Sequence, residues 1–170
     1  MTLPGKFRAL VITLSDRAYA GEYKDLSGPT VKEMLDNYFE TIGWEMESEI
    51  IVIADDVSIL RQLINESSQT YNVIITTGGT GIGPRDFTVD VVSELLEKQI
   101  PGIMELIRVK YGMDKPNALL SRGVAGVKDK SLIYTLPGSV KAVKEYMSEI
   151  LKSLQHAIYM QYGEDIHTKH

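Results

Sequence analysis

The residues with the clearest potential for chemistry lie in segment 76–86, which reads TTGGTGIGPRD. This segment follows the apolar run 73–75, expected to be a buried strand, and precedes a helical pattern that opens near Thr88. Glycine accepts positive φ angles and carries no side chain, so a glycine-rich turn lets backbone amides approach an anion closely. Because Arg85 and Asp86 stand at its exit, the turn indicates phosphate chemistry, with a metal ion as a further option.

The turn does not match the better-known phosphate-binding motifs. Read as G-x-G-x-x-G from Gly79, it has Pro84 where the last glycine should stand, and no G-K-S/T follows, which excludes a Walker A loop. The glycines near the end of a predicted buried strand favour an anion site, whose type the residues do not specify. A tight strand-to-helix turn without a ligand is the alternative interpretation.

Asp86 has both a structural and a chemical interpretation. It could cap the following helix, as Thr88 also could, or it could pair with Arg85. Alternatively, its carboxylate lies beside bound phosphates, where it holds Mg²⁺ or orients a reacting group.

Asp55 and Asp56 follow the apolar run 50–53 and present a similar choice. One of them can cap the next helix, which leaves the other free at the same edge of the sheet as Asp86. A free carboxylate there has the same options of metal binding or substrate orientation.

Two more short motifs follow predicted strands. Ser15, Asp16 and Arg17 end the first strand, where a solvated turn is the usual meaning. Pro137-Gly138-Ser139 precedes the last helix, whose free amides attract anions, so a second phosphate could rest there with help from Ser139 and Lys141. A simple N-cap at Ser139 is the alternative.

Apolar periodicity predicts alternating strands and helices. Continuous apolar runs indicate strands at 9–14, 50–53 and 73–76, and a hairpin-like pair at 119–127 and 132–136. Helical spacing indicates helices at 31–38, around 60–64, from 88 to 96, at 103–111 and at 140–158. Segment 15–28 is expected to be a polar loop, and Thr30 with Glu33 forms a capping-box signature for the first helix. This alternation predicts a three-layer α/β/α domain with a mostly parallel sheet, in which ligands sit at the carboxyl ends of the strands.

Composition narrows the functional class. The 170 residues suit one domain, and the net charge of −5 argues against a nucleic-acid surface. No apolar run approaches the roughly 20 residues needed to span a bilayer, residues 1–5 do not resemble a signal peptide, and cysteine is absent. A cytoplasmic location is therefore expected. The three histidines, His156, His167 and His170, are far in sequence from the loops above, and transfer to an anionic acceptor needs no histidine base.

Taken together, the motifs resemble those of the Mog/MoaB family of molybdenum-cofactor biosynthesis proteins, which includes the amino-terminal domain of gephyrin. The matches run nearly the whole chain and comprise Ser15-Asp16-Arg17, the G-x-Y-x-D-x-S-G loop at 21–28, segment 76–88, Pro101-Gly102, Leu120-Ser121-Arg122 and segment 136–139. Segment 151–158 is similar to the carboxyl-terminal helix of the family's adenylyltransferase branch, with Gln155 where proline is usual. Ala54 and the spacing of 82–84 also depart from the commoner pattern.

The resemblance implies a trimeric α/β protein that transfers the adenylyl group of ATP to molybdopterin, with Mg²⁺ as cofactor. It implies that Asp55 and Asp86 are the catalytic and metal-binding acids. The residues implied to bind the substrates are Ser15, Asp16, Gly78, Gly79, Thr80, Gly81, Arg85, Thr88, Pro137, Gly138 and Ser139. It also leaves room for handover of the product to a molybdenum-inserting protein.

Two other functional classes stay open at this stage. A MoaB-like protein would bind molybdopterin or a nucleotide without turnover. A nicotinamide-dependent oxidoreductase shares the coarse fold pattern but would need a dinucleotide fingerprint, which segment 76–86 lacks.

Overall fold

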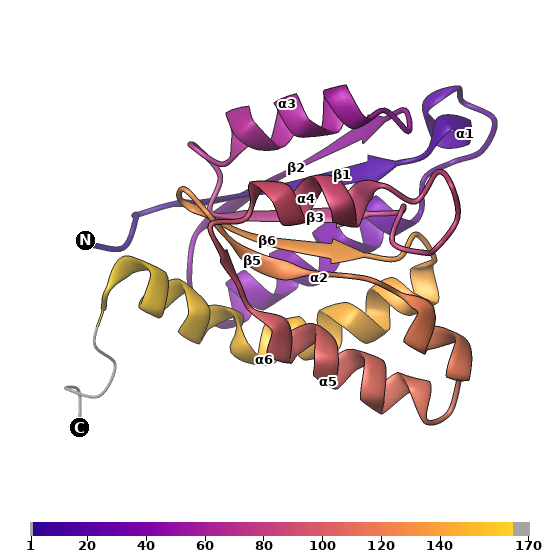
Figure 1. The fold of residues 1–170 in the computed structure, drawn as a ribbon. Helices are drawn as coiled ribbons and strands as arrows, with labels where there is room; N and C mark the ends of the chain where they lie inside the picture. The colour runs from indigo at the N-terminus through magenta and orange to yellow at the C-terminus, as the bar shows by residue number, and fades with distance from the viewer. Residues whose placement is uncertain (1, 165–170) are drawn as a thin grey trace.

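The computed structural model describes residues 2–164 and consists of a six-stranded sheet between two layers of helices (Figure 1). The strands are β1 (Phe7–Leu14), β2 (Met46–Ile53), β3 (Val73–Thr77), β4 (Lys98–Gln99), β5 (Ala125–Lys128) and β6 (Ser131–Leu136). The helices are α1 (Asp16–Tyr19), α2 (Ser27–Thr41), α3 (Val57–Ser67), α4 (Thr88–Leu95), α5 (Pro101–Gly112), α6 (Val140–Tyr162) and a 3₁₀ helix, η1 (Pro116–Leu120). None of the helices in these residues is both long and apolar enough to cross a membrane.

The strand order is β2-β1-β3-β6-β5-β4, and the first four of these strands are parallel. Leu14 pairs with Ile53, and Thr77 pairs with both Thr13 and Leu136, so these four strands end level with one another. The loops that follow them therefore meet at one edge of the sheet. This confirms the expectation that the candidate motifs share the carboxyl edge.

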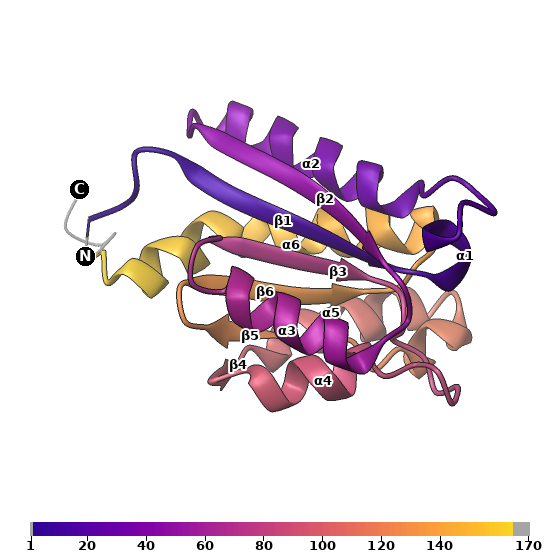
Figure 2. The same cartoon turned by 90° about the horizontal axis from the view of Figure 1, so that it is seen from above.

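Side chains alternate between the two faces of the sheet and build two cores. Ala9 and Val11 face the core that contains α2, α5 and α6, whereas Leu10 and Ile12 face the core that contains α3 and α4. Figures 1 and 2 show α3 and α4 on one face of the sheet and α2, α5 and α6 on the other. The predicted three-layer α/β/α architecture with a mostly parallel sheet is confirmed.

The hairpin-like pair is only partly as predicted. β5 and β6 are antiparallel across the turn at 129–130, but residues 119–120 belong to η1 and the strand begins only at Ala125. Pro116 opens η1, and segment 121–124 makes contacts with the glycine turn and β6 instead of a strand of its own. Strand β4 was not predicted, because two exposed residues, Lys98 and Gln99, carry no apolar signal.

The predicted cap of α2 is wrong, and both candidate caps of α4 are wrong, although α4 begins at Thr88 as expected. Helix α2 begins at Ser27, and Thr30 lies inside it, because Asp25 Oδ1 already accepts the amides of Ser27 (3.0 Å) and Gly28 (3.2 Å). In α4 the N-cap is Phe87, which makes no side-chain capping bond, so neither Asp86 nor Thr88 caps that helix. The segment expected to be a loop also contains the short helix α1, capped by Ser15.

Candidate functional site

The glycine turn between β3 and α4 needs glycine at its first two positions. Gly78 and Gly79 have φ angles of +98° and +69°, in the region that side chains rarely adopt. A Cβ atom on Gly78 would lie 2.5 Å from Leu14 O, and one on Gly79 would lie 2.2 Å from Thr88 Oγ1. The turn is thus pressed against β1 on one side and against α4 on the other, which keeps its backbone in one conformation.

Asp86 folds back onto the turn instead of capping α4. Its Oδ2 accepts the amide of Gly83 at 2.8 Å. A Cβ atom on Gly81 would lie 2.7 Å from the same oxygen, and one on Gly83 would lie 2.9 Å from it. Glycine at 81 and 83 therefore makes room for the Asp86 carboxylate.

The ends of β1 and β2 carry an acidic pair with an arginine between its members. The amide of Asp55 donates to Asp16 Oδ1 at 2.8 Å, and Arg85 forms ion pairs with Asp16 and with Asp55, the latter at 3.5 Å. Burial, and then the charge of Asp86, raise the pKa of Asp55. Arg85 therefore pairs with these two acids. The alternative in which Arg85 pairs with Asp86 is wrong.

Asp56 caps α3, because its Oδ1 accepts the amide of Ile59 at 2.9 Å. Its neighbour Asp55 is left to face the site, which confirms the expected division between the two acids. At the start of α6, Ser139 Oγ accepts the amide of Ala142 at 3.2 Å, so the N-cap interpretation of Ser139 is confirmed.

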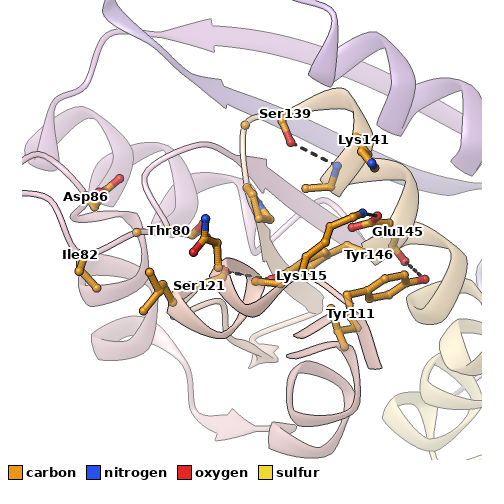
Figure 3. Close-up of a pocket in the computed structure, with 18 of the residues that line it drawn as sticks. Thr80, Ile82, Asp86, Tyr111, Lys115, Ser121, Ser139, Lys141, Glu145 and Tyr146 are labelled. Carbon is orange, nitrogen blue, oxygen red and sulfur yellow. Dashed lines mark hydrogen bonds and ion pairs between the residues drawn. The ribbon is translucent and has the colours of Figure 1, made fainter. Parts of the chain in front are cut away.

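A pocket of about 610 Å³ opens between the glycine turn, α5, η1 and the first turns of α6. Seven of the predicted site residues line it, namely Gly79, Thr80, Gly81, Asp86, Pro137, Gly138 and Ser139. Figure 3 shows Asp86, Ile82 and Thr80 on one side of the pocket and Tyr111, Lys115 and Glu145 on the other. The pocket thus joins two loops that are about 55 residues apart in the sequence.

The other predicted residues lie around this pocket rather than in its wall. Ser15, Asp16, Asp55 and Arg85 form the neighbouring part of the carboxyl edge, and Gly78 packs beneath Gly138. Thr88 is completely buried under the turn, where its amide donates to Gly79 O at 3.2 Å.

The far wall of the pocket was not predicted from the sequence. Lys115 and Glu145 form an ion pair at 2.6 Å, and this contact raises the pKa of Lys115. Tyr146 donates to Ser121 Oγ at 2.8 Å, and both side chains line the pocket. Ser121 belongs to the matched motif at 120–122. Lys115 and Glu145 carry no local sequence signal, because their pairing depends on how η1 and α6 pack.

Comparison with known proteins decides the family. A family model described as a probable molybdopterin binding domain matches residues 10–156. Molybdopterin adenylyltransferase of Helicobacter pylori strain J99 is 33% identical over 162 residues, which cover 91% of this chain and 90% of that protein. The chain belongs to the Mog/MoaB family of molybdenum-cofactor biosynthesis proteins.

Two further relatives extend the Mog/MoaB assignment. Gephyrin of Dictyostelium discoideum is 38% identical over 155 residues, which are 87% of this chain and 21% of gephyrin, so the chain spans about a fifth of that protein. The crystal structure of the molybdopterin biosynthesis enzyme MoaB from Thermus thermophilus superposes with a TM-score of 0.81 at 34% identity, covering 93% of this chain and 98% of that one. The fold expected from the motifs is therefore the fold of the family.

The described carboxylates of this Mog/MoaB chain could bind a metal ion only if other ligands completed its coordination. Within residues 2–164, no group of three histidine, aspartate or glutamate side chains could hold a metal ion. Mg²⁺ is commonly held by one or two carboxylates plus substrate phosphates and water. Asp86 lies close enough to Asp55 for its charge to raise the pKa of Asp55, and a cation would relieve that repulsion. These two acids would therefore hold Mg²⁺ only together with other ligands, such as phosphate oxygens and water.

Proposed function

We propose that this protein transfers the adenylyl group of ATP to molybdopterin, giving adenylyl-molybdopterin and pyrophosphate. The observation that carries the proposal is the single pocket that joins the glycine turn, the Asp86 carboxylate and the amino end of α6. Backbone amides, a helix amino terminus and a carboxylate are the groups that a phosphate-transfer site uses. The similarity to molybdopterin adenylyltransferase supports the same activity.

In the proposed reaction, an oxygen of the terminal phosphate of molybdopterin forms a bond to the α-phosphorus of ATP. The bond from that phosphorus to the bridging oxygen breaks, and pyrophosphate leaves with the electron pair. Both substrates are anions, so the protein must offset their repulsion and hold them in line.

Residues of the pocket and of the neighbouring sheet edge would bind the phosphates and orient the two substrates. The amides of the turn at 79–82 and the start of α6 at Gly138 and Ser139 would bind phosphate oxygens. On the far wall, Lys115 is paired with Glu145, and Lys141 leaves an excess of one positive charge. Asp86 would orient the reacting phosphates and Asp55 the pterin, with Ser15, Asp16 and Arg85 beside Asp55. Thr88, which is buried, would act only by supporting the turn through Gly79. Mg²⁺ held by the two acids would supply further charge neutralisation during the transfer.

The test is pyrophosphate release from Mg-ATP by the purified protein, with and without molybdopterin, alongside Asp86→Asn. Asparagine keeps an oxygen that can accept the Gly83 amide, so the turn should retain its shape while the charge is lost. We expect release that requires both the pterin and Asp86. Release that is unchanged in Asp86→Asn would refute the role of this residue.

The second candidate is a binding protein that holds molybdopterin or a nucleotide without turnover. The observation in its favour is that molybdenum cofactor biosynthesis protein B of Staphylococcus carnosus is 41% identical to this chain, whereas the adenylyltransferase of Helicobacter pylori is 33% identical. It predicts saturable binding of the pterin with no pyrophosphate release, so the same experiment separates the two.

We also propose that the protein is a homotrimer in the cytoplasm and that it hands its product to a molybdenum-inserting protein. An apolar stripe supports the assembly, because Leu106 and Val109 on α5 and Met113 at its C-cap lie at helical spacing with exposed fractions of 54%, 59% and 81%. Apolar patches of this kind commonly mark protein interfaces.

A further inference from the structure

Arg122 donates hydrogen bonds to three backbone carbonyl groups of the glycine turn and its exit. Its backbone amide donates to Thr80 O at 2.8 Å, its Nε to Gly81 O at 2.7 Å and its Nη2 to Asp86 O at 2.5 Å. The guanidinium also pairs with Asp90 in the first turn of α4, at 2.8 and 3.0 Å. One side chain therefore joins the turn, Asp86 and α4.

These contacts set the direction of the turn's amides. In a trans peptide unit the C=O and N–H groups point in opposite directions. Because the carbonyls of Thr80 and Gly81 point at Arg122, the amides of Gly81 and Ile82 point away from it. Neither amide donates to an acceptor within residues 2–164, and both residues line the pocket. The contacts of Arg122 thus leave these two donors available to an anion.

Arg122 does this from outside the site. It is absent from the wall of the pocket, whereas its neighbour Ser121 is part of that wall. The segment is itself held in place, because Arg108 of α5 donates to Ser121 O at 3.5 Å and to Gly123 O at 3.0 Å. The guanidinium therefore approaches the turn from a braced backbone.

We propose that Arg122 is a positioning residue, which aims the amides of Gly81 and Ile82 and the backbone of Asp86 at the phosphates of the substrate. This inference rests on the proposed phosphate-transfer function, although the contacts themselves do not. Lysine cannot replace Arg122, because one ammonium group cannot match the planar fork that reaches Gly81, Asp86 and Asp90 together.

The first test measures the turn itself, by amide hydrogen exchange in Arg122→Lys. The amides of Gly83, Asp86 and Thr88 are hydrogen-bonded within the turn, so they report its order. We expect their exchange to become about tenfold faster while exchange in the central strands is unchanged. The matched control is Arg61→Lys, because Arg61 also pairs with α4, through Glu94 at 2.5 Å, and the two arginines are similarly exposed at 38% and 35%.

The second test is kinetic. We expect Arg122→Lys to lower the kcat of pterin-dependent pyrophosphate release about 10- to 100-fold, with a smaller change in KM for ATP, since the misplaced groups act on the transition state. Asp90→Asn, which leaves the carbonyl contacts of Arg122 in place, should lose less than Arg122→Lys. Arg61→Lys should keep the wild-type rate.

Three results would overturn the inference. These are wild-type exchange in the turn of Arg122→Lys, faster exchange across the whole sheet, and an equal effect in Arg61→Lys. If the wild type itself releases no pyrophosphate, the adenylyl-transfer proposal fails. The exchange measurement then still decides the role of Arg122.

Discussion

Asp16 and Asp55 hold each other across the ends of two adjacent strands. The amide of Asp55 donates to Asp16 Oδ1 at 2.8 Å, and the amide of Asp16 lies 3.4 Å from Asp55 Oδ2. Each acid thus fixes the backbone that carries the other, and Arg85 pairs with both carboxylates. Asp55 is therefore held in place by contacts within the protein itself, as the proposed role of orienting a substrate requires.

Adjacent acids at 55 and 56 allow a matched test of this role. We expect Asp55→Asn to lower pterin-dependent pyrophosphate release on the order of 100-fold, because the charge that orients substrate is lost. Asp56→Asn should retain the wild-type rate and stability, because asparagine caps a helix as well as aspartate does and Asp56 only caps α3. Equal losses in both variants would show that general acidity at this edge, and not Asp55, supports the activity.

Gly79 should be intolerant of even one methyl group. Its φ is +69°, and a Cβ atom would lie 2.2 Å from Thr88 Oγ1, so we expect Gly79→Ala to lower the free energy of unfolding by about 1–3 kcal/mol. Urea denaturation measures this change. Gly102→Ala is the control, since a Cβ atom there meets nothing within 4 Å and alanine favours the helix α5. A Gly79→Ala variant as stable as Gly102→Ala would contradict the tight packing of the turn.

Much of the fold could be predicted because the central strands are buried on both faces. Continuous apolar runs such as 9–14 and 73–76 are typical of such strands in an α/β protein. The prediction was poorer at the rim of the sheet. Strand β2 was expected at 50–53 but starts at Met46, since its first half alternates with Glu47 and Glu49 at a half-exposed edge.

The site was predictable where chemistry depends on residues close in sequence. The turn at 78–81, its partner Asp86 and the start of α6 all carry local signals, and the structure brings them to one pocket. The contacts of Arg122 and the pair of Lys115 with Glu145 could not be predicted in this way. They join segments 30 or more residues apart, so they become visible only once α5, η1 and α6 have packed.

Glu149 should make the stability of the protein depend on acidic pH. Its side chain is only 4% exposed, and hydrogen bonds from Lys110 and then Lys152 lower its pKa from 4.5 to about 2. A carboxyl group whose pKa is lowered by folding stabilises the protein fully above the unfolded value and loses this effect as the pH falls through the folded value. Unfolding free energy should therefore fall between about pH 4.5 and pH 2.

Urea unfolding of Glu149→Gln across this pH range checks the assignment. The variant should be about 1–3 kcal/mol less stable than the wild type at neutral pH, and the difference should vanish near pH 2. Lys110→Met removes the first of the two ammonium partners, so it should reduce the pH dependence without abolishing it. A constant difference between wild type and Glu149→Gln at all pH values would rule out titration of Glu149 as the cause.

Met113 provides a test of the proposed trimer. Met113 is 81% exposed at the end of the apolar stripe, just after α5. If this stripe is buried between subunits, a charged side chain at position 113 would be costly. We expect Met113→Glu to shift the mass measured by light scattering from three chains toward one. Met160→Glu changes a methionine that is 68% exposed on α6, so it controls for the loss of an exposed apolar side chain as such. A trimer that survives Met113→Glu would place the interface elsewhere, and a wild-type monomer would refute the assembly.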